Sequence, residues 1–305
     1  MSRARAALGF WLCLAGCRAP LRTQNVGRAA HRDAPPFQGR FPREPGHHRV
    51  SFQVRQNTRE VELWVPRLRD DEPNPPVVLA LHGTGCTNTA LVDDAHIERL
   101  ALEGGAIVIA PRAEAQPAGD WDHDGEACYW NTTDHDPDTN PDLALVRALV
   151  AAAVRDLHGD EARTYVMGDS NGAFFTVTVA AVLRNRFAAM ASNSGGLVPC
   201  PTTQSCHFVT NATQCEAVAQ APNRCHCAGP VHPVAITPGM PPAFVSHGTA
   251  DTTVSVQYSC ALAARLRATG VDVRVQLRPG DDHGIAPDFL QSAWAFLRRH
   301  RLAER

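Results

Sequence analysis

The stretch "YVMGDSNGAFF", residues 165–175, places a serine between two glycines directly after a run of apolar, strand-prone residues. The residues that follow Gly172 have helical character. Glycines two positions before and two positions after Ser170 allow a strand and a helix to approach each other without steric conflict, and they raise the serine above the sheet. This layout predicts that Ser170 is a nucleophile. The alternative is that its hydroxyl only caps the N-terminus of the helix.

Strand-like and helix-like runs alternate on both sides of this turn. We expect strands at residues 49–55, 61–66, 77–82, 106–111, 164–168, 187–192, 243–248 and 271–277. We expect helices at about residues 88–104, 142–157, 171–184, 255–268 and 287–301. The first two strands can form a hairpin, and the later ones are apolar throughout, as in strands covered on both faces. The alternation predicts an α/β fold with a mostly parallel central sheet, right-handed crossovers and helices on both faces.

A serine becomes a nucleophile only with a base and an orienting carboxylate. After Ser170, the run "AFVSHG" leads into a loop with Asp251, and the next strand leads into "DDHGIAP", which carries His283. We therefore expect His283 to be the general base and Asp251 the orienting acid. The alternatives are a capping role for Asp251 and a surface position for His283. Asp281 and Asp282 are too close in sequence to the histidine to be the first choice.

Nucleophilic catalysis by Ser170 also needs backbone N–H donors that point at the developing negative charge. The segment "VVLALHGTGCTNT", residues 77–89, is a strand followed by a glycine-containing loop. We expect the backbone N–H groups of Thr84 and Asn171 to form this oxyanion hole. For His82 we expect a structural role, in which packing and hydrogen bonds shape the loop.

Four motifs together carry a resemblance to a known family: "LALHGTGCT", "YVMGDSNGAFF", "SHGTADTTV" and "DDHGIAP", which frame residues 77–285. They resemble the α/β-hydrolase branch that holds extracellular polyhydroxybutyrate depolymerases, feruloyl esterases and acetylxylan esterases. The resemblance implies an α/β-hydrolase fold and cofactor-free hydrolysis of feruloyl, acetyl or hydroxyalkanoate esters through an acyl-enzyme. Asp169 departs from the family pattern, since an uncharged residue is common there. The alternative function is that of a non-catalytic surface binding protein on the same fold.

The N-terminus resembles an export signal. It has an arginine-bearing start, a short apolar stretch and then "LAGC", which ends at Cys17. The apolar stretch is far below the roughly 20 residues that a membrane-spanning helix needs. We expect residues 1–17 to be a lipoprotein-type signal segment with lipid attached at Cys17, or alternatively an ordinary signal peptide. We expect 18–48 to be a disordered tether, 49–305 to be the catalytic domain, and the lipid to be the sole membrane contact.

Cysteine usage agrees with export. The chain has ten cysteines, of which Cys13 and Cys17 lie in the signal segment. Five of the other eight fall within a polar, period-free stretch, so we expect a cysteine-rich insertion at 198–235 held by disulfides. If all eight are paired, five cysteines require at least one partner outside the insertion. We expect Cys260 to be that partner, which leaves Cys86 and Cys128 for each other.

A zinc site is the alternative for the insertion. Its candidate ligands are Cys225, Cys227, His207 and His226. Their irregular spacing lacks the paired CxxC pattern of structural zinc modules, so we favour disulfides.

The acidic segment "DWDHDGEACYWNTTDHDPDTNPD", residues 120–142, raises a second metal hypothesis. Its first residues follow the D-x-D-x-D-G spacing of calcium loops, and the candidate calcium ligands are Asp120, Asp122 and Asp124. The final glutamate of such a loop is replaced by an asparagine, so a solvated acidic loop is the alternative. Trp121 and Trp130 are candidates for the wall of a substrate pocket, or else they cover the core.

Length and charge limit the remaining classes of protein. The chain has 305 residues, of which 44% are hydrophobic, enough for one large α/β domain. The formal net charge is −2, and the sequence contains no basic stripe interleaved with aromatic residues. We therefore expect no nucleic-acid partner. The expected partner is the ester substrate, and the sequence leaves the oligomeric state open.

Overall fold

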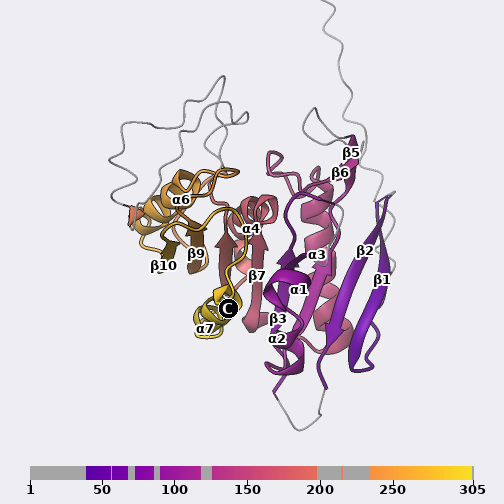
Figure 1. Ribbon diagram of the computed structural model, residues 1–305. Coiled ribbons are helices and arrows are strands. Elements are labelled where there is room, and N and C mark those ends of the chain that lie inside the picture. Colours follow the sequence, from indigo (N-terminus) through magenta and orange to yellow (C-terminus); the bar gives the residue numbers. More distant parts are fainter. Residues whose placement is uncertain are drawn as a thin grey trace, which may run out of the picture. The chain divides into compact units, whose positions relative to one another are not determined.

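An eight-stranded sheet lies at the centre of the computed structural model (Figure 1). The structure describes residues 39–55, 57–67, 73–85, 90–117, 126–197, 214–215 and 234–303. All of these belong to one compact unit, Pro35–Arg305.

The described strands are β1 Gly46–Val54, β2 Asn57–Val65, β3 Val77–Leu81, β4 Ile107–Pro111, β5 Ala115–Pro117, β6 Glu126–Cys128, β7 Thr164–Asp169, β8 Ala189–Asn193, β9 Ala243–Gly248 and β10 Val273–Arg278. The described helices are α1 Ala90–Ala95, α2 Arg99–Leu102, α3 Pro141–Leu157, α4 Asn171–Val182, α6 Gln257–Ala268 and α7 Phe289–Leu297, with short 3₁₀ helices at Glu161–Arg163 and Arg184–Arg186.

The large sheet has the strand order β1-β2-β4-β3-β7-β8-β9-β10. Strand β2 is antiparallel to both β1 and β4, and every pair from β4 to β10 is parallel. The leading hairpin and the mostly parallel sheet predicted from the sequence are therefore confirmed. Because β7, β9 and β10 run in the same direction, the loops after them meet at one edge of the sheet.

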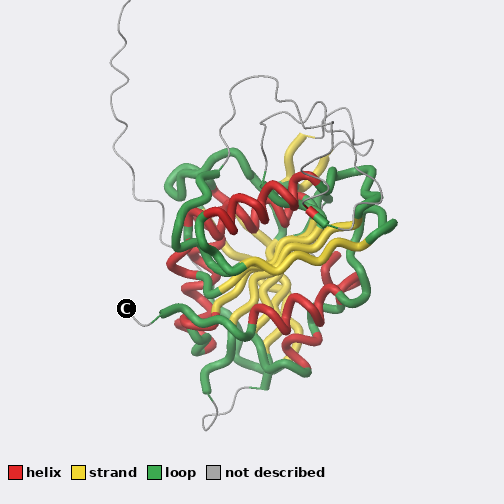
Figure 2. Tube along the Cα trace, turned by 90° about the vertical axis from the view of Figure 1, so that its left-hand side faces the viewer, coloured by secondary structure: helices red, strands yellow, loops and turns green. Residues whose placement is uncertain are grey.

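Alternate residues of the central strands enter two separate cores. In β3, Val77, Leu79 and Leu81 pack with α3, α4 and α6 on one face. Val78 and Ala80 pack with α1, α2 and α7 on the other. Figure 2 shows the helices on both sides of the strands. This period of two explains why the central strands are apolar at every position, as the sequence predicted.

Two sequence expectations need correction. The single helix expected at 88–104 is two short helices, because His96 has a φ of 54° and this left-handed backbone ends the first helix. The strand expected at 49–55 begins earlier than predicted, at Gly46. Phe41 already packs in the core at 3% exposure, with a T-shaped contact to Phe52.

A disulfide joins Cys215 to Cys260 on α6, with the two Cα atoms 5.0 Å apart. It connects the predicted insertion to the main body of the fold through the expected partner, Cys260, so this prediction is confirmed. The candidate zinc ligands, and the insertion at 198–213 and 216–233, lie outside the described residues. Cys128 is also disulfide-bonded, and its expected partner Cys86 lies outside the described residues.

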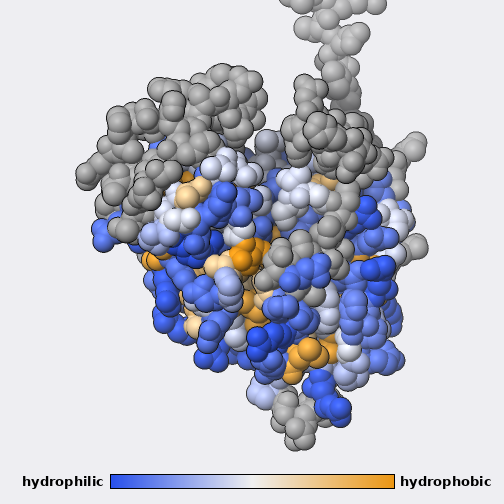
Figure 3. Space-filling model, in the orientation of Figure 1, coloured by the Kyte–Doolittle hydropathy of each residue, from blue (hydrophilic) through white to orange (hydrophobic). Residues whose placement is uncertain are grey.

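Figure 3 shows a face on which hydrophilic residues predominate and apolar residues form small patches. Among the described residues, Leu102 is the large apolar side chain that is strongly exposed, at 73%. Within the same part of the chain, no helix combines the length and the apolar character needed to cross a membrane.

Candidate active site

Ser170 occupies a sharp turn between β7, which ends at Asp169, and α4, which begins at Asn171. Its backbone has φ 52° and ψ −121°, a conformation that non-glycine residues rarely adopt. The turn is held from both sides. The Ser170 N–H donates to the Asn193 carbonyl oxygen at 2.9 Å, and the Ser170 carbonyl oxygen accepts from Ala173 N at 2.9 Å.

The glycines beside Ser170 are required by close backbone approach. A Cβ atom on Gly172 would lie 2.1 Å from the Leu81 carbonyl oxygen and 2.4 Å from that of His82. A Cβ atom on Gly168 would lie 2.3 Å from the Gly172 carbonyl oxygen. The spacing that first singled out this stretch therefore has the steric cause that we predicted.

Three predicted residues meet above this turn. His283 Nε2 lies 3.1 Å from Ser170 Oγ, and His283 Nδ1 lies 2.7 Å from Asp251 Oδ2. Because a carboxylate only accepts, Nδ1 carries the proton and Nε2 is free to accept the serine proton. General-base activation of a serine requires this geometry. Ser170 and His283 are 113 residues apart in sequence.

Asp251 is buried at 2% exposure, and both of its oxygens are occupied. Oδ1 accepts from the backbone N–H groups of Thr253 at 2.9 Å and Val254 at 2.7 Å. The capping role and the contact with histidine were alternatives in the sequence, and the structure combines them in one carboxylate. Burial alone would raise the pKa of Asp251, but hydrogen bonds from His247 and His283 outweigh it and hold the pKa well below its usual range.

The neighbouring carboxylates have other partners. Asp282 Oδ1 accepts from Thr252 N at 2.9 Å and from His283 N at 2.8 Å, so it ties the histidine loop to the Asp251 loop. Asp281 Oδ2 lies 3.0 Å from Arg278 Nε. Neither carboxylate is hydrogen-bonded to the His283 ring, which agrees with our choice of Asp251.

A buried polar network, not anticipated from the sequence, supports the histidine loop. Asn193 Nδ2 donates to Asp169 Oδ1 at 2.6 Å and to the Gly284 carbonyl oxygen at 3.0 Å. Arg278, 9% exposed, donates to Asn193 Oδ1 at 3.2 Å and to the same Gly284 oxygen at 3.1 Å. Asp169 thus connects the serine turn to the residue that follows His283. Nothing in the local sequence marks this network, since its members come from three separate strands and one loop.

Asp169→Asn is expected to move the acid limb of the pH profile of kcat/KM to lower pH. Burial lowers the pKa of His283, but the hydrogen bond and charge of Asp251, together with the charges of Asp169 and Asp282, outweigh it and raise the pKa above its ordinary value. Removing one negative charge lowers this raised pKa, so the neutral base persists to lower pH. Asparagine keeps the oxygen that Asn193 needs. A pH–rate series on both proteins measures the shift, and a limb that stays in place or moves to higher pH would contradict it.

The segments that carry Thr84 and Asn171, the expected oxyanion donors, are both hydrogen-bonded to residues 128–130. The Gly85 N–H donates to the Cys128 carbonyl oxygen at 2.9 Å. The Trp130 N–H donates to Asn171 Oδ1 at 2.7 Å. Thr84 itself is exposed. The loop after β3 and the start of α4 are therefore connected to one common segment.

Trp130 lies in the core rather than on a pocket wall. It is 1% exposed, and its ring stacks on Phe175 with the ring centroids 5.2 Å apart. Its indole N–H donates to the His82 carbonyl oxygen at 2.9 Å. Of the two roles considered for this residue, the structure favours the covering of the core, and its indole N–H also holds the start of the loop after β3.

His82 has the structural role expected from the sequence. Its Nδ1–H donates to the Gly83 carbonyl oxygen at 2.6 Å, and its Nε2 accepts from Ala113 N at 2.9 Å. Burial lowers the pKa of His82 to about 4, so the ring is neutral near pH 7.

Several predicted residues lie outside the described part of the chain. They are Cys17, Asp120, Trp121, Asp122 and Asp124. Within the described residues, no group of three or more His, Cys, Asp or Glu side chains is placed to hold a metal ion.

Comparison with known proteins places the chain among hydrolases. The model of the prolyl oligopeptidase family matches residues 140–301, which include Ser170, Asp251 and His283. The probable acetylxylan esterase A of Aspergillus clavatus is 26% identical over 204 residues, which cover 66% of this chain. The match covers 64% of the fungal protein, slightly less than two thirds of its length.

Solved structures show the same fold. A thermostable esterase superposes with a TM-score of 0.56 and 19% identity, covering 84% of this chain and 63% of its own. The acetyl xylan esterase from Aspergillus awamori gives a TM-score of 0.50 and 17% identity, covering 78% of this chain and 94% of its own. The chain therefore has the α/β-hydrolase fold predicted from its motifs.

Proposed function

The chain belongs to the prolyl oligopeptidase family, and from this premise and the geometry of the site we propose that it is a serine esterase. The observation that carries the proposal is the hydrogen-bonded series from Ser170 through His283 to the buried Asp251. A serine that only capped a helix would need neither partner. In fact, the Ser170 side chain makes no capping hydrogen bond to α4.

The proposed reaction has two halves. Ser170 Oγ attacks the ester carbonyl carbon, and its proton passes to His283 Nε2. The tetrahedral intermediate then expels the alcohol, which takes the proton from His283, and the acyl group stays on Ser170. In the second half His283 takes a proton from water, the resulting hydroxide attacks the acyl carbon, and the acid leaves as the proton returns to Ser170. This chemistry needs no cofactor.

The N–H groups of Thr84 and Asn171 are proposed to donate to the oxyanion in both halves. This assignment is supported by the position of Asn171 directly after the nucleophile and by the contacts of both segments with residues 128–130. Fixed donors stabilise developing charge without reorganising during the reaction.

Acetyl, feruloyl and hydroxyalkanoate esters are the proposed substrate class. The similarity to an acetylxylan esterase favours short acyl groups, of which acetyl is the first candidate. The name of the family raises peptide hydrolysis as the competing activity. An ester needs less help than an amide in expelling its leaving group, so a substrate series separates the two.

Fluorophosphonate labelling and a substrate series test the proposed function together. We expect the probe to label the wild-type protein and to leave Ser170→Ala unlabelled, because the probe reacts with an activated serine hydroxyl. We also expect kcat/KM to be higher for acetyl and feruloyl esters than for a prolyl peptide amide. No labelling of the folded wild-type protein would favour the alternative of a binding protein. A preference for the peptide would replace the ester assignment.

We propose that the enzyme works outside the reducing cytoplasm. The disulfide between Cys215 and Cys260 supports this location, because such bonds persist in oxidising compartments. Lipid attachment at Cys17 stays a prediction from the sequence.

A further inference from the structure

A second histidine contacts the same oxygen of Asp251 that His283 uses. His247, the fifth residue of β9, has its side chain fully buried, and its Nε2 lies 3.1 Å from Asp251 Oδ2. The same nitrogen lies 2.9 Å from the Val254 carbonyl oxygen. The carboxylate of Asp251 is thus fixed by two backbone N–H groups on one oxygen and by two imidazoles on the other.

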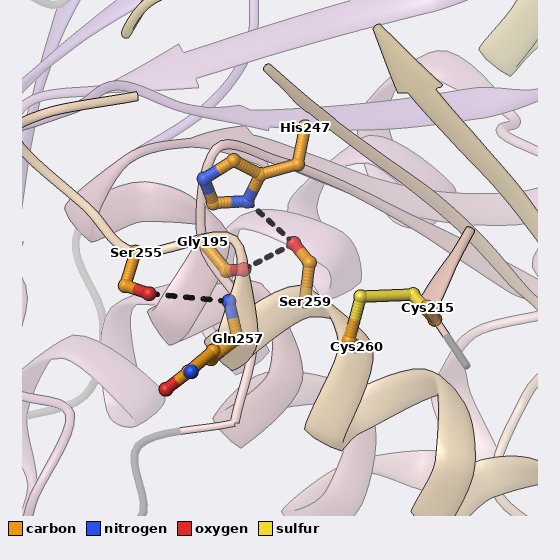
Figure 4. Close-up of a disulfide and its surroundings, with 7 residues drawn as sticks. All are labelled: Gly195, Cys215, His247, Ser255, Gln257, Ser259 and Cys260. Carbon is orange, nitrogen blue, oxygen red and sulfur yellow. Dashed lines mark hydrogen bonds between the residues drawn. A yellow bond between two sulfur atoms is a disulfide. The ribbon is translucent and has the colours of Figure 1, made fainter. Parts of the chain in front are cut away.

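The other side of the His247 ring faces helix α6. Its Nδ1 lies 2.7 Å from the hydroxyl oxygen of Ser259, and that hydroxyl donates to the Gly195 carbonyl oxygen at 2.5 Å (Figure 4). Ser259 is completely buried. Two serine–histidine pairs, Ser170–His283 and Ser259–His247, therefore contact the Asp251 carboxylate. Ser170 lies in the turn at the edge of the sheet, whereas Ser259 is buried and not accessible to a substrate.

The partners of the His247 ring constrain which of its two nitrogens carry protons. The single hydroxyl proton of Ser259 is given to Gly195, so Ser259 Oγ can only accept from His247 Nδ1. On the other side, Nε2 faces two acceptors, Asp251 Oδ2 and the Val254 oxygen, so it must also carry a proton. In a neutral ring with the proton on Nε2, the Ser259 hydroxyl would have to donate to Nδ1, and the Gly195 oxygen would lose its donor. In a neutral ring with the proton on Nδ1, the lone pair of Nε2 would face two oxygens. Only the doubly protonated ring satisfies every group.

We propose that His247 is a positioning residue, held as an imidazolium by Ser259, that fixes the Asp251 carboxylate and offsets its negative charge. The kinetic part of this proposal rests on the proposed function. The charged groups that face His283 are Asp251, Asp169 and Asp282. The imidazolium of His247 places a positive charge next to the Asp251 carboxylate. This positive charge keeps the pKa of His283 lower than it would be next to the three carboxylates alone.

His247→Gln is expected to lower kcat by roughly tenfold or more and to leave KM unchanged, because His247 orients the Asp251 carboxylate and does not contact the substrate. It is also expected to move the acid limb of the pH profile to higher pH, because His283 then faces an uncompensated carboxylate. Ser259→Ala leaves His247 Nδ1 without an acceptor and favours the neutral ring. We expect this variant to shift the limb in the same direction with a smaller loss of kcat.

Ser255→Ala is the matched control. Ser255 is a buried serine near the start of α6 whose hydroxyl accepts from Gln257 N at 3.3 Å, and it makes no hydrogen bond to His247 (Figure 4). Its acid limb should coincide with that of the wild type. A purely structural role for His247 would lower the folded fraction but leave the limb of the folded enzyme in place, and that result in both His247→Gln and Ser259→Ala would overturn the proposal.

Nitrogen-15 NMR of histidine-labelled protein tests the protonation state without any substrate. The signals of His247 are the ones that disappear in the spectrum of His247→Gln. If His247→Gln does not fold, the signals of His247 are identified as those that change in Ser259→Ala, because Ser259 is the partner of its Nδ1. We expect both ring nitrogens of His247 to carry protons in the folded protein. An unprotonated ring nitrogen in wild-type His247 would overturn the proposal. This readout is independent of esterase activity, so its failure is distinct from failure of the proposed function.

Discussion

Ser170→Ala is expected to lower kcat for a short p-nitrophenyl ester by about 10⁶, the order seen when a serine nucleophile is removed from its triad. His283→Ala should cause a loss of the same order, because the serine hydroxyl stays protonated without the base 3.1 Å away. The residues act as one unit, so the double variant should be no slower than either single variant.

The controls for this prediction separate chemistry from folding. Ser292→Ala changes a serine on α7, remote in sequence from the turn, and should keep wild-type rates. Circular dichroism should show that all variants are folded. Substantial activity in purified Ser170→Ala, or losses that add in the double variant, would contradict the assignment of these two residues.

Asp251→Asn is expected to lower kcat by about 10⁴, the order found for the same change in another serine triad. The carboxylate accepts the Nδ1 proton of His283 at 2.7 Å. An amide can present its NH₂ group there instead, which favours the tautomer that cannot accept the serine proton. Asp281→Asn is the matched control, because Asp281 is 53% exposed and pairs with Arg278. It should cost far less than Asp251→Asn.

The same substitution should also lower the free energy of unfolding. Asp251 shares its Oδ2 with His247, and removing one partner of a buried pair costs about 3–5 kcal/mol. Because the pKa of Asp251 is held below its usual value in the folded protein, this stabilisation is present above the ordinary pKa of aspartate. It is lost as the pH falls toward the folded value. Denaturant unfolding at neutral and acidic pH measures both regimes, and an equal difference at both would contradict this account.

Local sequence was sufficient for much of the fold and for the main members of the site. Apolar runs and turn residues predicted each strand of the large sheet within a few residues, because side-chain alternation and burial are recorded in neighbouring positions. The glycines around Ser170 predicted the turn because they stand two positions before and two positions after the serine, a spacing that is visible in the local sequence. The histidine and acid could be proposed since each follows a strand of a parallel sheet.

Only the tertiary structure decided which distant side chains meet. The pairing of β8, β9 and β10 brings Asn193 within reach of Arg278, and it leaves His247 behind Asp251. In sequence His247 is one polar residue in an apolar strand, and Trp130 is one aromatic residue in an acidic segment. The break at His96 likewise lies within a run that reads as one helix.

The sequence by itself therefore determined the α/β architecture, the serine turn and the candidates for base and acid, because hydrophobic periodicity and the spacing of glycines are local properties. The tertiary structure decided the pairing of one carboxylate with two imidazoles, the polar network that supports the histidine loop, and the contacts of residues 128–130 with the loop after β3 and the start of α4. Those features depend on strand register and on backbone groups that come from distant parts of the chain. Such hydrogen bonds form between groups that are close in space but distant in sequence, so, unlike hydrophobic burial, they produce no periodic pattern of residues in the sequence.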